Sequence, residues 1–89
     1  MEKSIFSKGY TIFLQRLREA RENADVTQGK VAMRLRKTQS FVSKCERGER
    51  RIDVIELRVF CRAIGISFVE FIRSLDAELN ELSNERVQD

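Results

Sequence analysis

The sequence predicts an all-α fold of five short helices with a C-terminal helical extension. Apolar residues recur at spacings of three and four along most of the 89 residues, which is the period of helices that pack on one face. No alternating run of β-branched residues bounded by turn residues indicates a strand. The expected helix boundaries carry threonine, aspartate, serine or glycine, which are residue types that begin or end helices.

The length indicates one small domain, with little room for a large catalytic pocket. We expect a loose lead-in over residues 1–9, the folded domain over 10–73 and an acidic helical tail over 74–89. No apolar run approaches the roughly 18 residues that a membrane span needs. The first residues lack the apolar segment of a signal peptide. We therefore expect a cytoplasmic protein that does not enter the membrane.

The side chains that most enzymes need are scarce. The chain has no histidine and no glycine-rich phosphate loop, and paired carboxylates occur only at capping positions and in the tail. Cys45 and Cys61 do not form a C-x-x-C pair, so we expect no metal site and no cofactor. In a reducing cytosol they are expected to be two small buried hydrophobes rather than a disulfide. We expect the chain not to be an enzyme.

The first two predicted helices follow from apolar spacing and one cap. The first runs from about Tyr10 to residues 23–25. Its apolar face consists of Phe13, Leu14, Leu17, Ala20 and Ala24. Thr27 is a good N-cap because its hydroxyl can accept from a backbone donor of the next turn. The second helix is therefore predicted over 28–35.

The third predicted helix spans 39–47, between an N-cap at Thr38 and Gly48, where a positive φ is commonly needed. Val42 and Cys45 face inward when each residue advances by about 100°. The opposite face is polar and basic, with Ser40, Lys44 and Arg47 at its centre, Ser43 on one flank and Phe41 on the other. This outward face offers both hydrogen-bond donors and acceptors.

Two capping boxes begin the last two predicted helices. Asp53 pairs with Glu56 at the start of the fourth helix, and Gly65 ends it. Ser67 pairs with Glu70 at the start of the fifth. The fourth helix is the most apolar, so we expect it to be the central, most buried element.

The tail carries a narrow apolar seam on an acidic helix. Leu75, Leu79 and Leu82 repeat at spacings of four and three. The seam either packs back onto the chain's own first or fifth helix, or it joins two copies of the chain. We favour the second alternative, a homodimer seam.

Positive charge is concentrated in residues 27–51. This stretch holds eight basic and two acidic residues, a net charge of +6 in a chain of formal charge +3. Residues 74–89 hold five acidic residues and one basic residue. A solvated basic face without a partner is the plainer alternative, but the clustering favours a polyanion, and nucleic acid in particular. The acidic end indicates a different partner.

Three segments together resemble the phage-repressor and Cro type of helix-turn-helix, the xenobiotic-response-element regulators of bacteria and phages. They are LREAR, TQGKVAMRLRKTQSFVSKCERGERRID and AIGISFVEFI, and the resemblance covers about Leu14 to Ile72. It is specific, because two Thr-Gln openings, an alanine between them and a Glu-Arg-Gly stand at fixed offsets. The resemblance implies double-stranded DNA as the partner.

The resemblance also implies a role for each matching residue. The implied base-reading residues are Gln39, Ser40 and Lys44. Glutamine can pair with adenine, and lysine can reach the acceptors of guanine. Flanking or phosphate contacts are expected from Gln28, Arg36, Lys37, Phe41, Ser43, Arg47, Arg50 and Arg51. Arg21 and Glu46 match a pair that, in relatives, forms an ion pair tying the first helix to the third.

Two positions leave alternatives open. Relatives commonly place glycine at the turn of the motif, where this chain has Arg36. Either the turn has another shape, or Arg36 takes a positive φ at a cost of about 1 kcal/mol, which a phosphate contact would partly offset. Phe41 either lies partly in the core or contacts a sugar or a thymine methyl group.

We therefore expect a sequence-specific DNA-binding regulator. It would act as a repressor by blocking polymerase, and it would bind a palindromic operator as a homodimer with half-sites about 10 bp apart. Activation stays open. The alternative is an antitoxin-like or adaptor module that binds a protein partner through its acidic tail and for which DNA binding is secondary.

Overall fold

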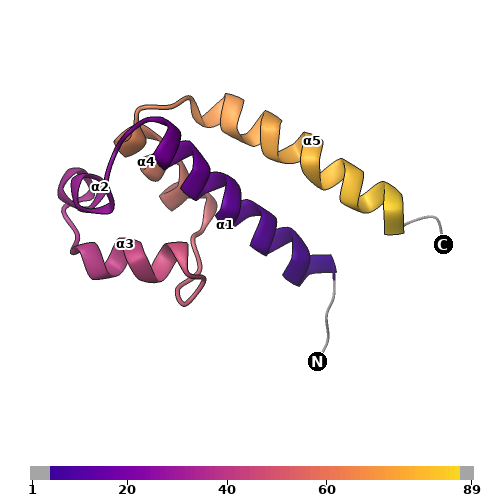
Figure 1. Ribbon diagram of the computed structural model, residues 1–89, viewed down its shortest axis with the longest axis horizontal. Coiled ribbons are helices and arrows are strands. Elements are labelled where there is room, and N and C mark those ends of the chain that lie inside the picture. The colour runs from indigo at the N-terminus through magenta and orange to yellow at the C-terminus, as the bar shows by residue number, and fades with distance from the viewer. Residues whose placement is uncertain (1–4, 87–89) are drawn as a thin grey trace.

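The computed structural model describes residues 5–86 of the chain, with side chains described for 8–82. Within this range the secondary structure consists of five α-helices and no strand. They are α1 (Ile5–Asn23), α2 (Gln28–Leu35), α3 (Gln39–Glu46), α4 (Val54–Ile64) and α5 (Phe68–Arg86). The all-α prediction is confirmed. The two long helices α1 and α5 lie side by side in opposite directions, and α2 and α3 occupy the other end of the molecule (Figure 1).

One apolar core joins all five helices. Its buried members are Phe13, Leu17, Val31, Ala32, Val42, Cys45, Ile52, Leu57, Phe60, Cys61, Ala63, Ile64, Phe71 and Leu75. Helix α4 contributes more of them than any other element, which confirms its predicted central place. Cys45 and Cys61 are free and fully buried, as predicted. Burial raises the pKa of the Cys61 thiol to about 11, so this cysteine stays protonated and unreactive at neutral pH.

The four predicted N-caps are all present. The hydroxyl oxygens of Thr27 and Thr38 accept hydrogen bonds from backbone N–H groups three residues on, each at 3.1 Å. Ser67 caps α5 in the same way. Asp53 forms a full capping box, because its side chain accepts from the Glu56 N–H while the Glu56 carboxylate accepts from the Asp53 N–H. These local bonds fix where three short helices and α5 begin.

Helices α1 to α4 end in a shared motif with one residue in the left-handed region. The residues are Asp25 (φ 62°), Arg36 (φ 60°), Gly48 (φ 82°) and Gly65 (φ 94°). In each case this residue and the next donate backbone hydrogen bonds into the last turn of the helix. The open question at the turn is thereby answered: Arg36 takes the strained conformation, so the turn keeps the shape that glycine gives in relatives.

The predicted loose lead-in is wrong for residues 5–9. Helix α1 begins at Ile5 rather than near Tyr10, while residues 1–4 lie outside the described range. The physical reason is tertiary. Helix α5 runs alongside the early turns of α1, and a β-carbon at Gly9 would lie only 3.6 Å from Leu79 Cδ2. Packing of this kind stabilises helical turns that local sequence supports weakly.

The same contact involves leucines of the predicted dimer seam. Leu75 is only 9% exposed within the single chain, and Leu79 packs against its core. Leu82, one helical turn further along α5, is partly buried. Leu75 and Leu79 therefore pack within the chain, which is the first of the two alternatives for the seam. Leu79 lies next to Gly9 in the early turns of α1.

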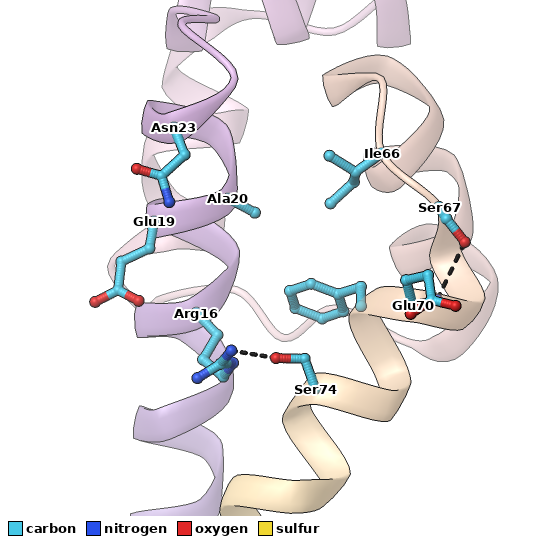
Figure 2. Close-up of a pocket in the computed structure, with 9 residues that line it drawn as sticks. Arg16, Glu19, Ala20, Asn23, Ile66, Ser67, Glu70 and Ser74 are labelled. Atoms are coloured by element: carbon cyan, nitrogen blue, oxygen red, sulfur yellow. Dashed lines mark hydrogen bonds between the residues drawn. The ribbon is translucent and has the colours of Figure 1, made fainter.

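Polar side chains reinforce the α1–α5 contact. Arg16 reaches across from α1 to α5, where its Nη2 donates to Ser74 Oγ (Figure 2). Its Nη1 lies 2.6 Å from Glu78 Oε1. These bonds border an open pocket of about 250 Å³ between α1 and the start of α5. The acidic tail therefore continues α5 as part of the fold.

Candidate nucleic-acid interface

Helix α3 presents one face to solvent while its other face is anchored in the core. Val42 and Cys45 are completely buried. The three predicted base-reading residues Gln39, Ser40 and Lys44 are all exposed. In Figure 1, α3 runs along the edge of the molecule remote from α5. An exposed polar helix on a rigid base is the arrangement needed to enter a groove of a duplex.

A largely buried ion pair ties α1 to α3. Arg21 Nε lies 2.6 Å from Glu46 Oε2, and Arg21 Nη2 donates to Glu46 Oε1 at 3.1 Å. The two side chains are only 11% and 6% exposed. Arg21 also donates to the Val26 carbonyl at 3.0 Å. The hydrogen bond to Glu46 raises the pKa of Arg21. The two hydrogen bonds of this pair hold α3 in a fixed orientation against α1.

Gln28 has a role that sequence reasoning missed. Its Nε2 donates to Glu46 Oε1 at 2.9 Å, so the first residue of α2 completes the pair between α1 and α3. The resemblance implies a phosphate contact for this side chain, but here its amide nitrogen is used inside the protein. The Glu46 carboxylate of α3 thus accepts hydrogen bonds from both Arg21 of α1 and Gln28 of α2, and so it connects three helices.

Phe41 lies between the core and a cluster of cations. Its ring stacks on Phe60 with centroids 6.5 Å apart, and its side chain is partly buried. Lys37 Nζ lies 5.2 Å and the Arg50 guanidinium 4.8 Å from the ring centroid. Of the two alternatives, the structure places Phe41 in the partly buried position. Both cations gain from the negative face of the ring, which orients them.

The Arg50 side chain, for which a phosphate contact was expected, is held by several contacts within the protein. Its two Nη atoms donate to the two carboxylate oxygens of Glu56 at 3.1 and 2.9 Å. Nη1 also donates to the backbone carbonyl of Arg51. Together with the Phe41 ring, these contacts hold the loop after α3 against the start of α4. Arg50 therefore positions this loop.

Arg51 and Tyr10 fix the other side of the same loop. The Arg51 guanidinium lies 4.2 Å from the centroid of the Tyr10 ring. The Tyr10 hydroxyl accepts a hydrogen bond from the Ile52 N–H at 3.0 Å. Tyr10 was expected only as the start of the first helix. The aromatic ring gave no signal in the sequence, because its partners lie about forty residues away.

The remaining predicted contacts lie around the exposed face of α3. Arg36 and Lys37 stand exposed at the turn before the helix, and Ser43 lies half-buried on its flank. Arg47 is exposed at its end, where it donates to Ser43 Oγ and to Glu49 Oε2 at 2.8 Å. The predicted base-reading residues and the flanking cations Arg36, Lys37 and Arg47 are thus all exposed, on α3 or next to its ends.

The geometry of α2, turn and α3 defines a helix-turn-helix DNA-binding domain. A family model for the helix-turn-helix domain matches residues 12–71. A solved structure described as an XRE-family like protein from Pseudomonas syringae pv. tomato str. DC3000 is 46% identical, with a TM-score of 0.80, over 83% of this chain and 90% of the other. No curated protein matches the chain.

The chain belongs to the XRE-type helix-turn-helix family of DNA-binding transcription regulators. The resemblance found in the sequence is confirmed, and so is the fold that it implies. Among the described residues, no helix is long and apolar enough to cross a membrane.

Proposed function

We propose that this regulator is a repressor that binds an inverted-repeat operator as a homodimer, with α3 in the major groove. The observation that carries the proposal is the exposed set Gln39, Ser40 and Lys44 on a helix whose other face is buried. Gln39 would pair with adenine and Lys44 with guanine, while Ser40 accepts or donates. Repression follows when a protein seated on the operator blocks polymerase.

Phosphate contacts supply affinity, and base contacts supply preference. Arg36, Lys37 and Arg47 surround α3 as exposed cations, and each phosphate contact releases counterions and steepens the dependence of affinity on salt. A contact from Arg36 would also offset part of the cost of its positive φ. Gln28, Ser43, Phe41, Arg50 and Arg51 act mainly by shaping the surface that receives the backbone.

The proposal of a homodimer is supported by the size of the reading face. One copy of α3 offers three base-reading side chains, which is few for a sequence-specific regulator. Two copies related by a two-fold axis read two half-sites about 10 bp apart. The alternative of an adaptor that acts through its tail has less support. Leu75, Leu79 and Glu78 serve the α1–α5 contact within the chain.

Selection from a random pool of DNA duplexes tests this function. The purified protein is incubated with the pool at a low and at a physiological salt concentration, and bound duplexes are sequenced. We expect an inverted repeat to emerge at both salts, with half-site centres about 10 bp apart. Binding that occurs only at low salt and without any enriched sequence would overturn the proposal. A single enriched half-site would overturn the homodimer alone.

A further inference from the structure

Glu49 is held beside the end of α3 by the backbone. Gly48 takes φ 82°, and the N–H groups of Gly48 and Glu49 donate to the carbonyls of Cys45 and Lys44 at 3.1 and 2.9 Å. A β-carbon at Gly48 would also crowd Leu14, because it would lie 3.1 Å from Leu14 Cδ1. This paired-bond motif fixes the direction in which the Glu49 side chain leaves the chain.

The Glu49 carboxylate forms an ion pair with Arg47, one of the cations of the proposed DNA surface. Its Oε2 lies 2.8 Å from Arg47 Nε, and Arg47 in turn donates to Ser43 on the flank of α3. The hydrogen bond from Arg47 lowers the pKa of Glu49, and the charge of Lys44 acts in the same direction. The carboxylate thus pairs with the flanking Arg47, and the charge of the proposed base-reading Lys44 also acts on it.

This ion pair differs from the two others near the site. The pair of Arg21 and Glu46 is buried, and Arg50 is held on both sides by Glu56 and the Phe41 ring. Arg47 and Glu49 are each 54% exposed. An exposed pair adds little to folding and exchanges readily with other ions.

The position of Glu49 also brings no benefit to α3 itself. Glu49 lies three residues past the end of α3, where the partial negative charge of the helix C-terminus gives an acidic side chain no stabilisation. Neither helix stability nor a buried network accounts for a carboxylate at this point. A phosphate has the same charge sign and also offers two acceptor oxygens, so it can accept the paired hydrogen bonds of an arginine as a carboxylate does.

We propose that Glu49 occupies, in the free protein, the place that a DNA phosphate takes on Arg47 in the complex. The inference rests on the proposed function, and it identifies Glu49 as a residue that controls the phosphate contact of Arg47. On binding, Arg47 exchanges carboxylate for phosphate and Glu49 is left next to the DNA backbone. Glu49 therefore weakens binding to every duplex, whatever its sequence. It also lowers the number of ions released on binding, by up to about one.

Replacing Glu49 with glutamine tests this exchange. Affinity is measured by fluorescence anisotropy on one selected duplex and one scrambled duplex over a series of salt concentrations. Glu49→Gln should bind both duplexes about fivefold more tightly at low salt, because the competing exposed pair is gone. The plot of log affinity against log salt should steepen by up to about one. Thermal unfolding should not change.

Glu19→Gln is the matched control, because it makes the same change of charge on the exposed surface of α1. It should stay within about twofold of the natural chain. In an Arg47→Ala background the gain from Glu49→Gln should largely disappear. If Glu49→Gln gains no more affinity than Glu19→Gln, or if its gain persists in the Arg47→Ala background, the inference is overturned. The proposed function is unaffected in that case, as long as the natural chain still binds the selected duplex. A natural chain that binds no duplex at low salt overturns both.

Discussion

Replacing Glu46 with alanine is expected to lower the free energy of unfolding by about 3 kcal/mol, because it leaves a buried arginine without its partner. Arg21 would lose both of its hydrogen bonds to Glu46, and Gln28 would lose its acceptor. For a domain of this size the melting temperature should fall by about 15 °C. Chemical denaturation followed by circular dichroism measures the change directly.

Glu22→Ala is the control for this change. Glu22 also faces Arg21, at 4.0 Å, but its side chain is 54% exposed. Its removal should cost less than about 0.5 kcal/mol, since exposed pairs add little. If Glu46→Ala and Glu22→Ala had similar small effects, the buried pair would not be what holds α3 on α1.

Replacing Leu75 with alanine should also cost about 3 kcal/mol, through the cavity that it opens between α5 and the core. Because Leu75 packs within one chain, the loss should be the same at every protein concentration. A residue in a dimer seam would behave differently, since the stability of a dimer rises with protein concentration. Melting curves recorded over a hundredfold range of concentration separate the two.

Val69→Ala is the matched control on the same helix, because Val69 is 59% exposed. It should change the melting temperature by no more than a few degrees. If the loss of stability in Leu75→Ala grew on dilution while Val69→Ala showed no change, Leu75 would lie in an interface between subunits.

The sequence was sufficient for the elements that local chemistry defines. Threonine caps at Thr27 and Thr38 begin α2 and α3 at the predicted residues. Gly48 and Gly65 take the positive φ that their places require. The recognition face of α3 was also predictable, because a helix that buries Val42 and Cys45 must expose the residues opposite to them.

Features that depend on distant parts of the chain were not predictable. The early start of α1 depends on α5, which lies at the other end of the sequence. The strain at Arg36 could not be decided, because its cost of about 1 kcal/mol is similar to what two backbone hydrogen bonds provide. The contacts of Arg50 and Arg51 depend on the path of the loop after α3, which has no periodic pattern to reveal it.

The direct test of base reading by α3 compares Lys44→Ala with Lys30→Ala. Each removes one exposed lysine, from α3 and from α2 respectively. Affinity is measured on the selected duplex and on a set in which each base pair of one half-site is changed in turn. Lys44→Ala should lose about 1–3 kcal/mol of discrimination at one position, while Lys30→Ala, which removes a lysine outside the proposed contacts, should keep its base preferences intact. An unchanged base preference in Lys44→Ala would contradict the placement of α3 in the major groove.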